Sequence, residues 1–397
     1  MSDMHEYEES YMLQCETNKC FGCGACIQGC PQKCIRWSSG EFGFLYPHVD
    51  NMLCVNCGLC ERMCPIGKPV SKCVKPEAYA VVNRNEAILN NSTSGGAFSA
   101  IAEKLIESDA SVYGSIMDES FQVRHIRASS LSDLRKIRGS KYVQSSIDDV
   151  FTQVKDDLKK GKEVLFSGTP CQIAAIHGFL GKEYANLLCI DIVCHGVASQ
   201  AYFDKFKDYL IKSDSELVSI EFRNKKYVGW SCGGVLHYKG KDKPFYNFNQ
   251  YYYSYFLSGE IYRNSCYSCP FANMNRIGDI TLGDFWGVES INTGFETTQG
   301  CSLMLINSEK GRRIMERIQD RIMFVQVNVD EAKRLNRQLT KPTKYKNARE
   351  VRLAEYDQLD GAEIQKIYKK THKVIILRGK LKSMLPYRIK LKLRKML

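Results

Sequence analysis

Residues 20–31 read CFGCGACIQGCP, and residues 54–65 read CVNCGLCERMCP. The two segments share one spacing, in which three cysteines lie three positions apart and a fourth follows four positions later, directly before a proline. Such spacing places three thiolates on one tight loop, which can wrap one side of a compact inorganic group. The duplication therefore predicts a small N-terminal module whose fold is organised by two groups bound through cysteine.

This spacing is the ligand pattern of bacterial proteins with two 4Fe–4S clusters, in which the fourth cysteine of each run ligates the other cluster. Under that rule one cluster is held by Cys20, Cys23, Cys26 and Cys64, and the second by Cys54, Cys57, Cys60 and Cys30. The alternative is a pair of zinc sites, but those usually combine two Cys-x2-Cys pairs and lack the trailing Cys-Pro. We therefore expect a ferredoxin-type domain with two 4Fe–4S clusters.

The bulk composition indicates a globular protein. The chain has 397 residues, of which 44% are hydrophobic and 25% are charged, and this length suits two or three domains. The first ten residues are acidic and polar, unlike a secretory leader, and no stretch has the roughly 18 apolar residues of a membrane span. We therefore expect a cytoplasmic protein whose 18 cysteines serve ligation and not disulfides.

The positive charge is concentrated at the end of the chain. The formal net charge is +12, and residues 369–397 contain eleven Lys or Arg and no acidic residue, so the other residues carry a net charge near +1. This distribution argues against nucleic acid as a partner. Three interpretations of the tail remain: peripheral attachment to an anionic surface at the inner face of the membrane, docking to an acidic partner, or a solvated end.

From residue 78 onward, strand-like and helix-like segments alternate. Buried strands are predicted at residues 163–166 and 187–193, with further strands at 218–222 and 234–238. Helices are predicted at residues 94–108, 146–160, 170–180, 199–212, 248–257 and 308–322. This alternation predicts a mixed or parallel sheet flanked by helices.

Two cysteines fall at the ends of the buried strands. Thr169 and Gln172 form a capping box, with Pro170 at the first helical position, so Cys171 lies in the first turn of a helix. The positive end of that helix favours a thiolate. Cys194 ends the next strand, and both thiols should therefore emerge at one edge of the sheet.

Four segments resemble the motifs of the coenzyme F420 hydrogenase/dehydrogenase beta-subunit family. They are residues 168–173, 191–197, 263–270 and 278–287, which read GTPCQI, DIVCHGV, RNSCYSCP and GDITLGDFWG. Residues 94–96 and 140–143 are similar to motifs of the N-terminal part of that family, so the resemblance covers about residues 78–349. Relatives in this family bind FAD and a 4Fe–4S cluster here.

The resemblance implies a multidomain chain of α+β and α/β character, in which a bacterial two-cluster ferredoxin fold precedes a mixed α/β flavoprotein domain. Its expected segments are a ferredoxin-type domain at residues 1–75, the N-terminal part of the beta-subunit-like domain at 76–160, its C-terminal part with an inner cluster and flavin at 161–350, and a basic tail at 351–397.

Carried over to this sequence, the resemblance implies a third 4Fe–4S cluster. Its ligands would be Cys171, Cys194, Cys266 and Cys269. The competing interpretation is that Cys171 and Cys194 are small buried hydrophobic residues, as free cysteines often are.

The candidates for the FAD site are Ser94, Gly95 and Gly96, whose backbone N–H groups at a helix start can bind pyrophosphate, and Lys141, as a positive charge near flavin or phosphate. An ordinary helix start and a solvated lysine are the alternatives. His195 and Lys141 are the candidate catalytic residues for proton transfer, although a hydrogen-bonded core histidine is the competing interpretation for His195.

Clusters pass single electrons, whereas a flavin can also release them as a pair. The first hypothesis is therefore an iron–sulfur flavoprotein reductase that passes electrons from a ferredoxin-like donor through the clusters to FAD, and on to an organic substrate or a deazaflavin coenzyme. The second is an electron-carrier subunit without a substrate site, which serves a separate catalytic partner within an oligomer.

Overall fold

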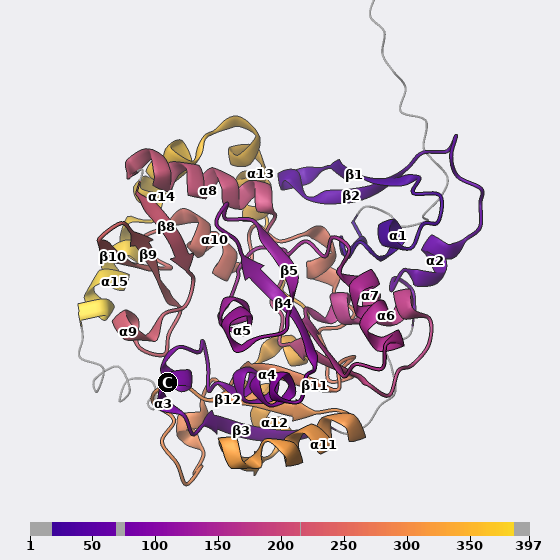
Figure 1. Ribbon diagram of the computed structural model, residues 1–397. Helices are drawn as coiled ribbons and strands as arrows, with labels where there is room; N and C mark the ends of the chain where they lie inside the picture. Colours follow the sequence, from indigo (N-terminus) through magenta and orange to yellow (C-terminus); the bar gives the residue numbers. More distant parts are fainter. Residues whose placement is uncertain (1–17, 69–75, 215, 385–397) are drawn as a thin grey trace, which may run out of the picture.

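The computed structural model describes residues 18–68, 76–214 and 216–384. Its largest sheet has eight strands and lies at the centre of the molecule (Figure 1). The strand order is β13-β3-β12-β11-β7-β6-β4-β5. The strands are β3 Glu77–Asn83, β4 Ser111–Met117, β5 Val123–Ala128, β6 Val164–Gly168, β7 Leu187–Ile192, β11 Ile280–Asp284, β12 Ser302–Ile306 and β13 Ile322–Val327. Strands from before and after residue 161 thus form one continuous sheet.

The middle of this sheet is parallel. β4, β6, β7 and β11 pair in parallel, and β5, β12, β3 and β13 add antiparallel pairs on the two sides. Val164, Leu165 and Phe166 of β6 are all fully buried, as expected for a strand that is covered on both faces. The predicted mixed sheet is therefore confirmed.

Helices cover both faces of the sheet. On one face, α4 (Ala97–Glu107), α5 (Leu131–Ile137) and α11 (Glu309–Arg317) share an apolar core with the strands. On the other face, α6 (Val150–Lys159) and α7 (Pro170–Leu180) share a second core. Neighbouring residues of β6 divide between the two cores, because successive side chains of a strand point to opposite faces.

Two of the predicted helices are shortened because part of each segment pairs with a strand. The helix predicted from residue 146 begins at Val150, because Ser146 pairs with β5 and donates its N–H to the Val123 carbonyl at 2.9 Å. The helix predicted to run to residue 322 ends at Arg317, and after a short 3-10 turn the chain enters β13, where Ile322 pairs with Asn83. In both places strand pairing overrides local helix propensity.

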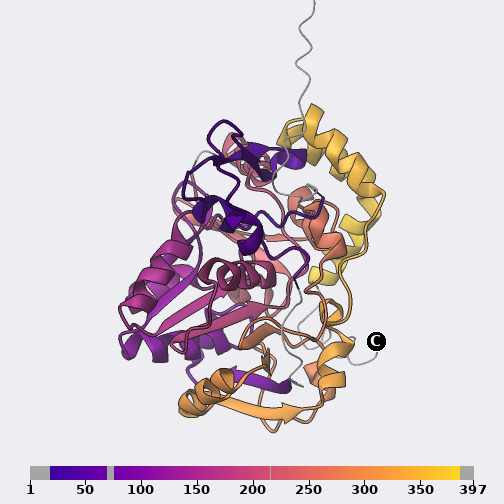
Figure 2. The ribbon, with the colours of Figure 1, turned by 90° about the vertical axis from the view of Figure 1, so that its right-hand side faces the viewer.

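A second body of structure, here called the aromatic lobe, packs beside the sheet. It contains β8 (Leu217–Glu221), β9 (Gly233–Tyr238), β10 (Lys241–Tyr246), α8 (Gln200–Ser213), α10 (Tyr251–Ser258) and α14 (Gly361–Thr371). Its core is rich in buried rings, such as Tyr252 and Phe206, whose centroids stack 5.3 Å apart. The C-terminal helices, yellow in Figure 2, run along one side of the molecule.

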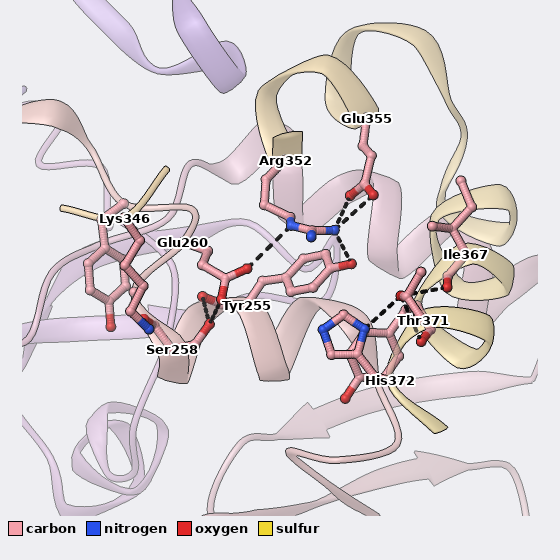
Figure 3. Close-up of polar contacts among 12 residues, drawn as sticks. Tyr255, Ser258, Glu260, Lys346, Arg352, Glu355, Ile367, Thr371 and His372 are labelled. Carbon is pink, nitrogen blue, oxygen red and sulfur yellow. Dashed lines mark hydrogen bonds and ion pairs between the residues drawn. The ribbon is translucent and has the colours of Figure 1, made fainter. Parts of the chain in front are cut away.

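One buried arginine fastens these C-terminal helices to the lobe. Arg352 of α13 (Ala348–Gln358) bonds both oxygens of Glu355, at 2.8 and 2.7 Å, and lies 3.3 Å from Glu260 (Figure 3). The same guanidinium contacts the hydroxyl of Tyr255 in α10. Of the segment expected as a basic tail, α13 and α14 therefore form part of the folded body, and its last residues, 385–397, lie outside the described residues.

The remaining elements are short or peripheral. The N-terminal part, residues 18–68, is here called the cysteine module and consists of α1 (Ala25–Gln28), a hairpin of β1 (Ile35–Ser39) and β2 (Leu45–Val49), and α2 (Leu59–Met63). Elsewhere lie α3 (Glu86–Asn90), α9 (Lys225–Val228), α12 (Val329–Arg334) and α15 (Lys373–Met384). Among the helices that the structure describes, none has the length and apolar character needed to cross a membrane.

Candidate redox site

The first cysteine set surrounds a small cavity in the module. The cavity is lined by all four cysteines that the sequence assigns to one cluster, Cys20, Cys23, Cys26 and Cys64. Gly24, at φ 76°, lets the chain turn into α1 directly between two of these cysteines. Burial, together with repulsion from the Cys20 and Cys64 thiolates, raises the pKa of Cys26 to about 12. The four sulfurs therefore lie close to one another across a desolvated space.

The second set lines a separate cavity of about 130 Å³. Its cysteines are Cys54, Cys57 and Cys60 from the second run and Cys30 from the first. This cavity thus brings Cys30 of the first run together with three cysteines of the second run. Cys34 also reaches this cavity, and its sulfur lies 3.3 Å from that of Cys30.

The donor chemistry of both cavities suits iron–sulfur clusters. Four soft thiolates around an enclosed space are the ligands that such clusters use. In the described part of the chain, no three His, Cys, Asp or Glu side chains are arranged to hold a single metal ion. The residues present therefore fit the clusters that their spacing predicts.

A third group of cysteines lies in the body of the protein. Cys171 is in the first turn of α7, Cys194 follows β7, and Cys266 and Cys269 belong to the 3-10 segment after Arg263. Gln172 accepts a bond from the Thr169 N–H at 3.0 Å, so the capping box that places Cys171 is present. Burial and repulsion from Cys269 raise the pKa of Cys171 to about 11, although the Thr169 hydroxyl opposes this shift. Burial raises the pKa of Cys194 well above its usual value, with repulsion from the other three thiolates.

The first set lies between the other two. Cys26 is repelled by Cys60 of the second set, and Cys23 by Cys171 of the third, while burial is the main cause of the raised pKa of both residues. Phe21 of the module shares an apolar cluster with Cys171 and Cys269. The three sets therefore follow one another from the module into the body.

A junction of buried polar contacts fixes the module to the body. The guanidinium of Arg263 donates to the Leu45 carbonyl at 2.8 Å, to the Cys20 carbonyl at 3.4 Å and to Gln144 at 3.0 Å. Ser265 also donates to the Cys20 carbonyl, at 3.0 Å. Behind it, Gly178 of α7 lies so close to Met63 of the module that an added Cβ would be 2.2 Å from the Met63 carbonyl oxygen.

A cavity of about 430 Å³ lies next to the third cysteine set, and Cys171 and Cys194 of that set form part of its lining. It lies at the carboxyl ends of β6, β7 and β11, where open α/β sheets usually bind ligands. Of the candidate residues from the sequence, its lining includes Ser94, Gly96, Lys141, Cys171, Cys194 and His195. The volume is within the range of cofactor and small-molecule sites.

The candidates for flavin contacts differ in whether their polar groups are already hydrogen-bonded within the protein. The helix predicted from residue 94 begins at Ala97, with Gly96 as its N-cap. The Gly95 N–H donates to Ser302 at 2.9 Å, and Gly95 packs against β3 and β12 and is not part of the cavity lining. Ser94 donates its hydroxyl to the Cys301 carbonyl at 2.8 Å. Ser94 and Gly96 thus line the cavity, and the Ser94 hydroxyl is already bonded to the residue before β12.

Lys141 closes the end of α5. Its ammonium donates to the carbonyls of Ile137 at 2.7 Å, Arg138 at 2.8 Å and Lys136 at 3.1 Å, which are the last carbonyls of the helix. Burial lowers the pKa of Lys141 to about 7. Lys141 therefore has a structural role as well as a place in the cavity wall, because its bonds to α5 fix the loop that carries Tyr142 and Gln144.

Two histidines border the cavity. Burial lowers the pKa of His195, and its backbone carbonyl accepts a bond from Thr343 at 2.6 Å. His125 was not among the sequence candidates. Its ring bonds Ser145 at 2.9 Å and the Ser167 carbonyl at 2.9 Å, and burial lowers its pKa to about 4. His125 is thus held neutral at the wall of the cavity.

The cavity wall also holds a charged and aromatic group, of which the sequence motifs contain Asp284 and Trp286 but not Arg223. Arg223 pairs with Asp284 at 2.9 Å and lies over Trp286, 5.5 Å from the ring centroid. Trp230 donates to Asp284 at 2.9 Å and stacks on Trp286 at 5.1 Å. Asp284 and Trp286 belong to the GDFWG segment quoted above, but Arg223 comes from a stretch without any motif.

Comparison with known proteins assigns two parts of the chain. Residues 161–332 match the family described as the C terminus of the coenzyme F420 hydrogenase/dehydrogenase beta subunit, and residues 19–68 match "4Fe-4S dicluster domain". A ferredoxin of Methanocaldococcus jannaschii is 37% identical over 62 residues, which are 16% of this chain and 79% of that protein.

Two longer relatives span most of the chain. A component protein of the F420H2 dehydrogenase of Methanosarcina mazei is 23% identical over 304 residues, 69% of this chain and 79% of that protein. An uncharacterised protein of M. jannaschii is 26% identical over 348 residues, 76% of this chain and 87% of that protein. A chain of the F420-reducing [NiFe] hydrogenase complex from Methanosarcina barkeri aligns with a TM-score of 0.44 and 16% identity, over 74% of this chain and 93% of that one.

Proposed function

We propose that the chain is an electron-transfer subunit, because residues 161–332 match the C-terminal domain of the coenzyme F420 hydrogenase/dehydrogenase beta subunit and residues 19–68 match a 4Fe–4S dicluster domain. It would exchange electrons with a ferredoxin-like protein at the cysteine module and with a catalytic partner at the body. The observation that carries this proposal is the succession of three cysteine sets, in which Phe21, next to Cys20 of the module, packs with Cys171 and Cys269 of the body in one apolar cluster.

The chain's own residues supply the ligands. The first and second cysteine sets would each hold one 4Fe–4S cluster, and Cys171, Cys194, Cys266 and Cys269 would hold a third. Such clusters, when bound, transfer single electrons. The protein's part is to fix their spacing through the junction and to limit the access of water to the thiolates, since of these twelve cysteines only Cys57 is exposed.

Iron and sulfide analysis of anaerobically purified protein tests this proposal. Three clusters require about 12 iron atoms per chain and the module alone about 8. A content near 8 iron atoms per chain would show that the third cluster is absent, and electron transfer would then be the role of the module alone. Stoichiometric zinc, without broad visible absorbance, would contradict the proposal as a whole.

The docking face for a redox partner is proposed at the second set. Cys57 is exposed, and the neighbouring Met52, Leu53 and Val55 expose 93%, 49% and 60% of their surface. Apolar residues gathered on a surface often mark a protein interface. Replacing Met52 and Val55 by Ser should raise the KM for a reduced ferredoxin at least about threefold and leave the iron content unchanged. An unchanged KM would place the docking face elsewhere.

A second candidate function, an iron–sulfur flavoprotein reductase, is favoured by the 430 Å³ cavity next to the third cysteine set. FAD bound there would join one-electron and two-electron chemistry and could reduce an organic substrate or a deazaflavin coenzyme. Gly96 and Ser94 would contact the cofactor from the start of α4, and His195 and Lys141, which line the same cavity, are the candidate proton carriers.

The two functions differ in what the isolated chain can do. A reductase should contain about one flavin per chain and should turn over its substrate with an artificial reductant. A carrier should reduce only its partner protein. Flavin released by acid and measured by fluorescence, together with deazaflavin reduction followed in the absence of any partner, distinguishes them.

A further inference from the structure

The last described helix, α15, presents an apolar stripe to solvent. Val374, Leu377, Leu381 and Met384 expose 61%, 60%, 59% and 81% of their surface. They are three or four residues apart, so they share one face of the helix. A helix on the surface of a globular protein normally turns polar residues outward.

The orientation of α15 is fixed by its opposite face. Ile376 packs against the aromatic lobe, and Gly379 lies against the ring of Phe248, where an added Cβ would be 2.2 Å from Cγ. The helix starts from His372, whose ring stacks on Tyr368 at 4.5 Å and lies next to Tyr255 (Figure 3). The apolar side chains that pack on the protein are therefore different from those of the stripe.

Basic residues flank the stripe on both sides. At 3.6 residues per turn, Arg378 and Lys382 lie along one edge of the stripe, and Lys373 and Lys380 lie along the other. All four are exposed, and the helix contains no acidic residue. In the sequence, residues 385–397 add five more basic residues and no acidic one.

We propose that α15 binds the headgroup region of an anionic lipid leaflet and attaches the protein reversibly to a membrane surface. An apolar stripe between two rows of Lys and Arg is the arrangement of helices that lie in a membrane interface. The basic rows attract anionic headgroups, and the aliphatic side chains enter the layer below. This surface is separate from the cysteine sets and does not depend on the electron-transfer proposal.

Cosedimentation of the full chain with lipid vesicles tests the proposal. The protein should bind vesicles of phosphatidylcholine with phosphatidylglycerol, and not pure phosphatidylcholine vesicles. Leu377→Ser with Leu381→Ser removes the stripe and should weaken binding at least about tenfold at unchanged charge. Arg378→Gln with Lys382→Gln should also weaken it and flatten its dependence on salt.

A matched control removes equally exposed apolar residues elsewhere. Val218 and Val351 expose 60% and 52% of their surface, and replacing both by Ser should leave vesicle binding unchanged. Visible absorbance and circular dichroism confirm that each variant is folded. Equal binding to both kinds of vesicle would overturn the proposal. Unchanged binding of the Leu377→Ser, Leu381→Ser variant would overturn it too. In that case α15 would serve to dock an acidic protein, or residues 385–397 would bind the vesicles.

Discussion

Cys30 shows how a residue can be next to one group in sequence and serve another in space. It directly precedes Pro31 in the first cysteine run, yet its side chain lines the cavity of Cys54, Cys57 and Cys60. We expect Cys30→Ser to remove about four iron atoms and the signals of the second cluster, while the first cluster remains. Iron analysis and electron paramagnetic resonance of the reduced protein measure this.

Cys34 provides the matched control, because its sulfur lies only 3.3 Å from that of Cys30. Cys34→Ser should keep the full iron content, since this residue is outside the doubled spacing. If Cys34→Ser loses iron and Cys30→Ser retains it, Cys34 is the cluster ligand and Cys30 is not.

Arg263 is a positioning residue between the module and the body. It is 2% exposed, and the rings of Phe44 and Tyr46 each lie 4.6 Å from its guanidinium. Arg263→Gln should lower the free energy of unfolding by about 2–4 kcal/mol, because it removes a buried guanidinium and leaves the carbonyl groups that it bonds without a donor. It should also lower the midpoint potential of the nearest cluster, since a positive charge favours the reduced, more negative state.

Arg263→Lys separates these two effects. The lysine keeps the charge but cannot reach the three acceptors that the planar guanidinium serves, so stability should fall while the potential changes less. Potentiometric titration followed by electron paramagnetic resonance gives the comparison. Identical potentials in the wild type and both variants would remove the electrostatic role of Arg263.

His125 predicts a dependence of stability on pH. Burial lowers its pKa from 6.5 to about 4, so between these values the unfolded chain binds a proton that the folded chain does not. Stability should therefore fall as the pH falls, by about 2 kcal/mol from this group between pH 7 and pH 5. His125→Gln should lose this increment in urea unfolding. An equal pH slope in the variant would show that His125 is already charged or exposed.

At the scale of elements, the start of α7 links the strand end of β6 to the third cysteine set. Cys171→Ala should remove about four iron atoms from a protein that contains about 12. Cys189 of β7 is the control, because it is a fully buried cysteine that faces the core under α6 and α7. Cys189→Ala should keep all the iron and lower stability by about 1 kcal/mol. Equal iron contents in the two variants would make Cys171 a packing residue.

Element types were easier to predict than their ends. The capping box of α7 and the buried strand β6 depend on residues within a few positions of one another, so the sequence predicts them correctly. The start of α6 and the end of α11 depend on pairing with β5 and β3, which are remote in sequence. Local patterns contain no information on those partners.

At the scale of the whole molecule, the same distinction separates the two kinds of site. The cysteine runs are predictable because three of the four ligands of each cluster are close in sequence, and the remote fourth ligand follows from a known rule. The wall of the large cavity brings Arg223 of the aromatic lobe to Asp284 at the end of β11. Arg223 has no motif around it, so only the folded chain identifies it as part of the cavity.

The junction around Arg263, Ser265 and Gly178 has a consequence for how fast the protein can work. In many redox proteins a tethered domain swings between two docking positions, and diffusion of that domain limits turnover. Here the module has no such freedom, because its backbone is bonded to the body and packed against α7 without a gap for a single methyl group. No domain motion should therefore limit the rate of electron transfer from the module to the body. Flash reduction of the module, followed at the body in buffers of increasing glycerol content, should give rates that do not depend on solvent viscosity.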